Sequence, residues 1–170
     1  MHTDPRLVTD VRKMKRGEFM QRYSHPFLGI TVVSMPEDGD EGAFDTGVYE
    51  MKTTDIDPGL SGEENMLCPV AKRPGANEFS FITIGRAGNN DIVIAANSVS
   101  KCHCMLQKSI DGFTLVDAES RNGTSLNGTA LTPRKSQPVV SGDVILFARG
   151  ISAMYLDSGS AYTWLRRTGI

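Results

Sequence analysis

The sequence predicts a mainly β protein whose central part is a two-layer antiparallel sandwich. From residue 66 onward, short apolar runs recur roughly every 8 to 12 residues, with turn residues between them. Two dipeptides, Asp111-Gly112 and Asn127-Gly128, are hairpin signals because their residues tolerate positive φ. Helical patterns occur only near the two ends. A chain of 170 residues can bury an adequate core in one such domain.

Residues 1–35 are expected to form an N-terminal extension made of an amphipathic helix and a short strand. Asp4-Pro5 is a helix start signal, because proline lacks the N–H that would be unpaired in the first turn. One helix should follow, with Gly17 weakening its middle. Its six basic residues are interpreted as a solvated face, with contact to a membrane surface or to nucleic acid as alternatives. Phe27–Val33 is apolar and β-branched, which predicts the strand.

Three further segments follow the extension. Residues 36–65 are rich in Gly and Asp, and we expect an acidic loop or linker. Residues 66–157 are the predicted sandwich domain, and residues 158–170 a C-terminal helix packed on it, capped by Asp157 or Ser158. The expected strands of the domain are Met66–Ala71, Phe79–Ile84, Ile92–Ile94, His103–Lys108, Phe113–Val116, Thr124–Leu126, Val144–Phe147 and Ile151–Leu156.

The charge distribution limits the classes of partner. The net charge is -2, but residues 66–170 carry eleven basic and seven acidic residues. This excess is too small for nucleic acid to be expected as the main partner, since that usually needs a concentrated basic face. Any selectivity for an anion must therefore come from local geometry.

The cysteines bear on the compartment and on metal binding. Three cysteines, with no signal peptide and no apolar membrane span, predict a cytoplasmic protein with reduced thiols. Cys102-His103-Cys104 is the densest candidate metal site. Side chains alternate along a strand, so the two cysteines are expected to face away from the histidine. We therefore expect neither a metal nor any other cofactor.

Five short motifs gather hydrogen-bond donors at the ends of strand-like runs. Strands supply a rigid frame, and the loops that follow them carry arginine, lysine, serine and asparagine side chains. All of these can donate hydrogen bonds to an anion. The motifs are Gly85-Arg86, Asn90-Asp91-Ile92, Ser100-Lys101-Cys102-His103, Arg121-Asn122-Gly123-Thr124 and Asn127-Gly128.

Together with Gly142-Asp143-Val144-Ile145, this ordered series resembles a forkhead-associated (FHA) domain. Each motif alone is weak, but their order and spacing are specific, and the resemblance covers residues 66–157. It implies an antiparallel β-sandwich of about eleven strands. The N-terminal helical extension and the short C-terminal helix lie outside it. It also implies that loops at one end bind phosphothreonine in partner proteins.

The resemblance assigns a role to each site residue. Arg86 would be the main phosphate contact and Ser100 would donate its hydroxyl to a phosphate oxygen. Arg121 and Asn122 would contact the phosphate or the peptide backbone. Lys101 stands where the family often has arginine or asparagine, and a lysine gives a point charge without bidentate geometry. Structural support is expected from Gly85, His103, Gly123, Thr124 and Asn127, with no catalytic role for His103.

The implied function is phosphothreonine-dependent protein-protein interaction, in a signalling adaptor that reads the products of an upstream Ser/Thr protein kinase. Its partner would be a Thr-phosphorylated protein or peptide. The alternative is a phospho-independent scaffold or assembly component that acts through the N-terminal extension. An enzyme is not expected, because the sequence has neither a Gly-x-Ser-x-Gly elbow nor a Gly-x-x-x-x-Gly-Lys loop.

The acidic segment suggests a regulatory hypothesis. Thr53 and Thr54 precede Ile56 and Asp57, which places a candidate specificity residue three positions after a threonine. Phosphorylation of Thr53 or Thr54 would create a ligand for the chain's own pocket at high effective concentration. The alternative is a solvated linker in which the two threonines have no such role.

Overall fold

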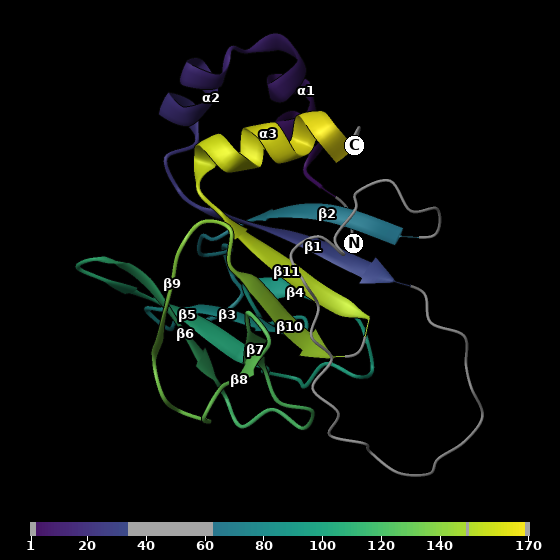
Figure 1. Cartoon of the computed structure of the whole chain (residues 1–170), viewed down its shortest axis with the longest axis vertical. Coiled ribbons are helices and arrows are strands. Elements are labelled where there is room, and N and C mark those ends of the chain that lie inside the picture. The colour runs from purple at the N-terminus through teal and green to yellow at the C-terminus, as the bar shows by residue number, and fades with distance from the viewer. Residues whose placement is uncertain (1–2, 34–62, 149, 169–170) are drawn as a thin grey trace.

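Two β-sheets face each other, and helices cap one end of them (Figure 1). This computed structural model describes residues 3–33, 63–148 and 150–168. The prediction of a mainly β, eleven-stranded sandwich is confirmed. The six-stranded sheet runs in the order β2 (Glu63–Pro69), β1 (Phe27–Val33), β11 (Ile151–Leu156), β10 (Val144–Ala148), β7 (Ser125–Leu126) and β8 (Thr129–Ala130). The five-stranded sheet runs in the order β4 (Ile92–Val93), β3 (Ile82–Gly85), β5 (Cys104–Ser109), β6 (Gly112–Asp117) and β9 (Gln137–Val139).

The main core fills the space between the two sheets. Strand β5 shows the pattern that builds it, because Cys104 and Leu106 are buried while Met105 and Gln107 are half-buried. Strand β3 is buried along its whole length. Large fully buried side chains include Leu28, Ile30, Ile84, Leu106, Leu115, Ile145 and Phe147. This core is the rigid frame from which the loops extend.

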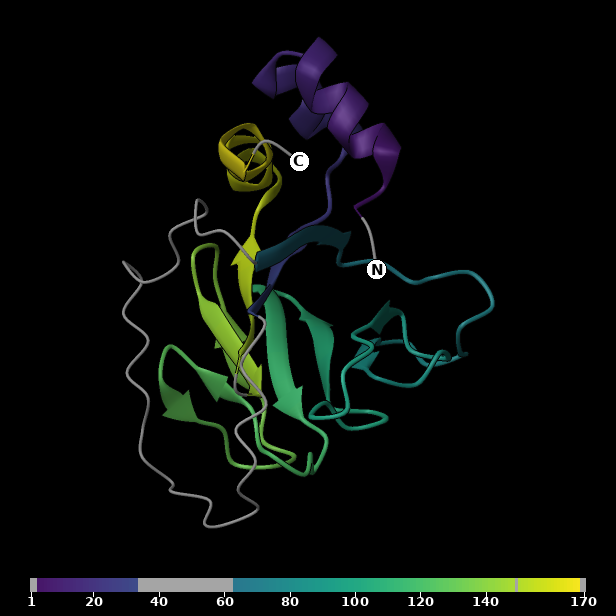
Figure 2. The ribbon, with the colours of Figure 1, turned by 90° about the vertical axis from the view of Figure 1, so that its right-hand side faces the viewer.

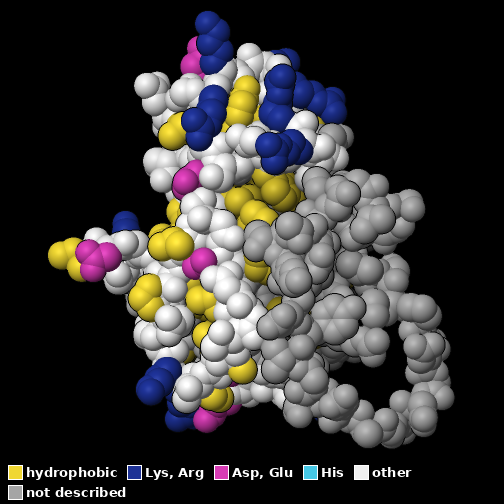
Figure 3. Space-filling view, viewed as in Figure 1, with side chains coloured by type: hydrophobic (Ala, Val, Ile, Leu, Met, Phe, Trp, Pro, Cys, Tyr) yellow, Lys and Arg dark blue, Asp and Glu magenta, His cyan; other side chains and the backbone are white. Residues whose placement is uncertain are grey.

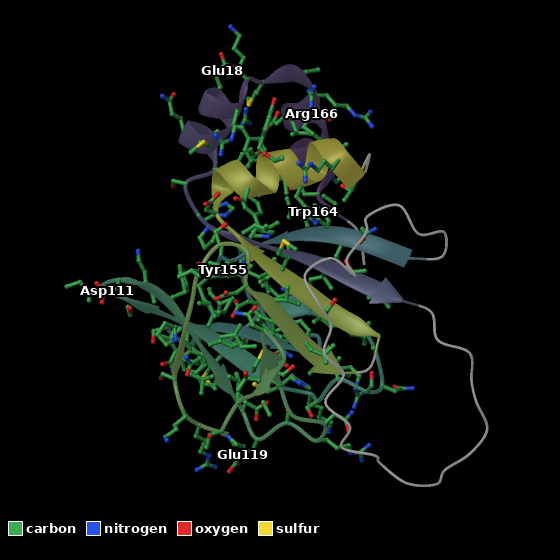
Figure 4. All side chains as sticks on the ribbon, viewed as in Figure 1. Glu18, Asp111, Glu119, Tyr155, Trp164 and Arg166 are labelled. Carbon is green, nitrogen blue, oxygen red and sulfur yellow. The ribbon has the colours of Figure 1, made fainter. Side chains whose placement is uncertain are left out.

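Two hairpins form at or next to the predicted turns, and the β5–β6 turn lies one residue before the expected pair. In the β5–β6 hairpin, Ser109 pairs with Gly112, and Ile110 and Asp111 form the turn between them. Gly112 has a φ of +131°. Figure 4 shows Asp111 at the far tip of this hairpin. Between β7 and β8, Asn127 and Gly128 have φ values of +51° and +80°. Positive φ at both positions is the requirement of a type I′ turn.

The structure departs from the expected strands in two respects. Strands β8 and β9 were not predicted, because neither has an apolar run and β9 contains Pro138. Proline is tolerated there because β9 is an edge strand. Strands β3 and β4 pair in parallel, with Ile84 opposite Ile92, so the sandwich is not purely antiparallel.

The single predicted N-terminal helix is in fact two helices. Helix α1 (Pro5–Lys13) is capped by the Asp4 carboxylate, which accepts the Arg6 N–H at 2.9 Å. Helix α2 (Arg16–Arg22) begins after a break at Lys15, whose N–H donates to Glu18 Oε2 at 2.8 Å. Gly17 lies inside α2, so the chain bends just before the position expected to be weakest.

A second hydrophobic core joins the N-terminal helices to α3 (Ser158–Thr168) and to the outer side of the six-stranded sheet. The Tyr162 hydroxyl donates to the Met14 carbonyl at 3.0 Å, and the Ser160 N–H donates to the Asp157 carboxylate at 2.7 Å. Figure 2 shows α1, α2 and α3 together at one end. The buried members of this core are Leu7, Val11, Phe19, Phe27, Leu67, Leu156, Ala161 and Leu165. We call α1, α2 and α3 the helical cap.

The outer face of the cap is basic, while its inner face packs on the sheet. Figure 3 shows Lys and Arg side chains gathered over the cap. Trp164 lies on the inner side, between α3 and the sheet (Figure 4). A Cβ added to Gly29 would come within 2.9 Å of its indole, so Trp164 is a packing residue that requires glycine beneath it. No helix in the described ranges is long and apolar enough to cross a membrane.

The strand pairing bears on the expected start of the sandwich domain. Strand β1, grouped with the extension in the sequence analysis, pairs with β2 on one side and β11 on the other. Strand β2 begins at Glu63, three positions before the expected domain start at 66. Most of the acidic segment at 36–65, including Thr53 and Thr54, lies outside the described residues.

Candidate functional site

A hollow of about 360 Å³ opens between the loops at one end of the sandwich. Three loops build it: the β3–β4 loop, the β4–β5 loop and the β6–β7 loop. Figure 4 labels Glu119, in the β6–β7 loop, at the end of the molecule away from the helical cap. The lining residues are Arg86, Asn97, Ser98, Val99, Ser100, Lys101, Cys102 and Arg121.

Arg86 follows β3 directly and is held against the β4–β5 loop. Its backbone N–H donates to the Ser100 carbonyl at 2.9 Å, and Ala87 N–H donates to the Lys101 carbonyl at 3.1 Å. The Arg86 Nε–H donates to the Val99 carbonyl at 3.2 Å. A guanidinium has five N–H donors, so this bond fixes the side chain while the terminal nitrogens remain able to bind a ligand.

Gly85 is required by this close approach of two backbones. It is buried at the end of β3, and a Cβ in its place would collide with the carbonyl of Lys101. The colliding atom belongs to the backbone that accepts the Ala87 N–H, so it cannot move aside cheaply. Because Gly85 has no side chain, β3 and the β4–β5 loop can approach closely at the site.

Ser100 links two of the three loops and keeps its proton available. Its Oγ accepts the backbone N–H of Arg121 at 2.9 Å. An accepting hydroxyl still has one O–H to donate. Its oxygen is thus held in place and its proton can reach an anion in the hollow.

His103 connects the loops from beneath the hollow. Its Nδ1 accepts the Ser100 N–H at 3.1 Å, and its Nε2 lies 3.2 Å from the Gly123 carbonyl. These partners require the neutral tautomer with the proton on Nε2. Burial lowers the pKa of His103 below its usual value, which favours the same neutral form. The ring is fully buried and edge-on to Phe147, so it supports the loops and does not face a ligand.

Asp117 organises the β6–β7 loop, although the sequence analysis did not include it. Its carboxylate accepts the Ser120 N–H at 3.0 Å, the Ser120 hydroxyl at 2.6 Å and the Thr124 hydroxyl at 2.5 Å. Burial alone would raise the pKa of Asp117, but the hydrogen bonds from Ser120 and Thr124 outweigh it and lower the pKa. The sequence signal for this role was the spacing of Asp117 from Ser120 and Thr124, three and seven residues later, since aspartate commonly accepts hydrogen bonds from residues that follow it in a turn.

Asn122 and Asn127 occupy different positions relative to the hollow. The Asn122 amide donates to the Ser98 carbonyl at 2.7 Å, so it joins the β6–β7 loop to the β4–β5 loop at the rim. Asn127 donates to Asp143 at 2.8 Å and accepts the Val144 N–H at 2.9 Å. It fixes the β7–β8 hairpin to β10, and it does not line the hollow.

The electrostatics of the hollow favour an anion. Arg86, Lys101 and Arg121 are all exposed and line it, and no carboxylate does. Three cations around one concave surface raise the local concentration of anions. Among the described residues, no group of His, Cys, Asp and Glu side chains could hold a metal ion. Cys102 is exposed and Cys104 is buried, so the two thiols lie in different environments.

Fold and site together define a β-sandwich domain with a cationic, loop-built hollow at one end. The family model described as "FHA domain" matches residues 82–148, from the start of β3 to the end of β10. Residues 82–148 are thus identified as an FHA domain. Members of the FHA family generally bind phosphothreonine peptides.

Several solved structures are similar to this chain. The FHA domain of a hypothetical protein from Arabidopsis thaliana is 25% identical, covers 78% of this chain and 86% of its own, and has a TM-score of 0.47. The N-terminal FHA domain of S. cerevisiae Rad53p, solved with a phosphothreonine peptide, is 22% identical, with coverages of 58% and 89% and a TM-score of 0.46. The Slr1951 protein from Synechocystis sp. is 19% identical, with coverages of 78% and 96% and a TM-score of 0.46. No curated protein matches the chain.

Proposed function

We propose that this chain binds phosphothreonine segments of partner proteins and acts as a signalling adaptor that reads the products of a Ser/Thr protein kinase. One observation carries the proposal: Arg86, Lys101 and Arg121 line a hollow into which Ser100 can donate a hydroxyl proton. The family assignment supports it, because FHA domains generally bind phosphothreonine peptides.

The chemistry of the hollow matches a phosphate group. A phosphothreonine carries about -1.5 to -2 charge and three strong acceptor oxygens. Arg86 offers a planar set of N–H donors, and Ser100 offers one short donor at a fixed position. Lys101 and Arg121 add charge from two other directions. Cations and small donors in this arrangement suit a tetrahedral dianion better than a planar carboxylate.

The rigidity of the loops supports tight binding. Ser100, His103 and Asn122 each connect two loops by hydrogen bonds, so the donors are in place before a ligand arrives. Pre-organised donors avoid the cost of ordering loops and side chains during association. We infer that most of the binding free energy comes from the phosphate, and that peptide residues after the phosphothreonine adjust it.

Arg86→Ala tests the proposal. A degenerate phosphothreonine peptide library selects the best peptide for the wild type, and calorimetry then compares the two proteins. Loss of a charge-assisted contact should weaken binding by about 2 to 5 kcal/mol. Arg134→Ala is the matched control, because Arg134 is exposed and pairs with Glu119 outside the hollow. Equal affinity of wild type and Arg86→Ala for the phosphopeptide would contradict the proposal.

The scaffold alternative needs a different test from deletion of residues 1–35. That deletion would remove β1, which lies between β2 and β11, and would damage the sandwich itself. Charge reversal on the exposed cap surface, Arg12→Glu with Lys13→Glu, leaves the second core intact because both side chains are exposed. Loss of a partner in this double variant, but not in Arg86→Ala, would favour the scaffold function.

A further inference from the structure

The segment between β2 and β3 lies against the loop that carries Arg86. Figure 2 shows the chain leaving β2, running outside the sandwich and returning toward the loops near β4. Residues 72–77 in this segment make hydrogen bonds with residues 88–91. They precede the region matched by the FHA family model, which begins at residue 82. None of them was among the predicted site residues.

Arg73 makes the most direct contact with this loop. Its Nε–H donates to the Asn90 carbonyl at 3.1 Å, and its Nη2 donates to the same carbonyl at 2.7 Å and also to the Gly88 carbonyl. A planar guanidinium can hold two carbonyls at fixed positions, which a lysine cannot do. Arg73 is an exposed residue, and every side-chain hydrogen bond that the described structure gives it goes to this loop.

Asp91 anchors the Arg73 backbone at the base of the loop. Its side chain is fully buried and accepts Lys72 Nζ at 2.8 Å and the Arg73 N–H at 3.0 Å. It also accepts the Thr83 N–H at 2.9 Å. Burial would raise the pKa of Asp91, but hydrogen bonds from Lys72, Thr83 and Arg73 hold it well below its usual range. The hydrogen bond to Asp91 therefore fixes the backbone from which the Arg73 side chain extends.

The other side of the same loop is tied to the β4–β5 loop. The Asn90 amide donates to the Ala87 carbonyl at 2.8 Å and to the Lys101 carbonyl at 2.6 Å. Asn77 adds a third tie, since its amide donates to the Asn89 carbonyl at 3.0 Å. Arg73 and Asn90 thus hold the short loop after Arg86 from opposite sides.

We propose that Arg73 is a positioning residue of the phosphothreonine site, which holds the loop from Arg86 to Asn90 in its binding-competent shape without touching the ligand. The proposal rests on the proposed function of the hollow. Loss of the guanidinium frees the Gly88 and Asn90 carbonyls, and the loop then spends only part of its time in the competent shape. Apparent affinity falls in proportion to that fraction.

The test compares wild type, Arg73→Ala, Arg73→Lys and Arg134→Ala in the full chain. Calorimetry with the library-selected phosphothreonine peptide should show affinity about tenfold weaker for Arg73→Ala. Arg73→Lys keeps the charge but loses the planar donors, so it should resemble Arg73→Ala. The backbone N–H of Asn90 donates to the Ala87 carbonyl, and its hydrogen exchange should be faster in both variants. Thermal midpoints should stay close to the wild type, because Arg73 is exposed.

Three outcomes separate the possible failures. Wild-type affinity in Arg73→Lys with weak binding in Arg73→Ala would show that Arg73 acts through its charge, which overturns the positioning role. Unchanged affinity and exchange in Arg73→Ala, with binding still lost in Arg86→Ala, would overturn the inference and leave the proposed function standing. If the wild type binds no phosphothreonine peptide, the proposed function fails, and unchanged Asn90 exchange in Arg73→Ala would reject the loop-holding role as well.

Discussion

Substitution of Phe19 by alanine should destabilise the whole domain, although Phe19 lies in the N-terminal extension. Its side chain is fully buried. The centroid of its ring lies 4.7 Å from that of Tyr23, 5.4 Å from that of Tyr162 and 6.3 Å from that of Phe27. These contacts join α2 to α3 and to β1. Replacement of a buried phenylalanine by alanine costs about 3 to 5 kcal/mol, a large fraction of the roughly 5 to 15 kcal/mol that stabilises a typical domain.

Urea unfolding followed by both fluorescence and circular dichroism measures this effect. The midpoint should fall in Phe19→Ala while the slope stays the same, because the same surface is exposed on unfolding. Met20→Ala is the matched control: Met20 is the next residue in α2 and is 42% exposed, so its change should be within about 0.5 kcal/mol. A loss below about 1 kcal/mol in Phe19→Ala, or a separate early transition for the cap, would refute the reasoning.

Two further predictions concern residues that support the site. Because the folded pKa of His103 is lowered, its contribution to stability is present above the unfolded pKa of about 6.5 and is lost as pH falls through the folded pKa. The unfolding free energy should therefore fall less steeply from pH 7 to pH 5 in His103→Gln than in wild type, and equal slopes would contradict the assignment. Gly85→Ala places a methyl group against the Lys101 carbonyl, so it should weaken phosphopeptide binding; a peptide titration that matches wild type would show that the backbone can adjust.

The sequence analysis placed the tight turns of two hairpins, because turn geometry depends on short local patterns. The two hairpins were predictable because few residue types accept the positive φ that Gly112, Asn127 and Gly128 adopt. Arg86, Ser100, Lys101 and Arg121 line one hollow because the loops that carry them lie at the same end of the sandwich. That these residues bind a ligand stays a prediction.

Other features depended on contacts that no local pattern contains. The hydrophobic run of β1 predicts a strand, but its partners β2 and β11 are set by the packing of the whole sheet. Arg73 donates hydrogen bonds to the Gly88 and Asn90 carbonyls, and because every residue has a backbone carbonyl, the sequence does not show which ones accept them. The same is true of the Asn122 bond to the Ser98 carbonyl. The break between α1 and α2 follows from a capping contact between Lys15 and Glu18 that outweighs the continuous helical pattern.

The pairing of β1 with β11 also constrains when the protein can fold during synthesis. Phe27 pairs with Leu156, so the early strand must wait for the late one to leave the ribosome. At about 5 to 20 residues per second, that wait is roughly 6 to 25 seconds. Phe19 and Leu7 wait longer, because their partners in α3 follow β11 in the chain. Strand β2 can pair with one edge of β1 earlier, but the edge that faces β11 stays unpaired on the nascent chain during this interval.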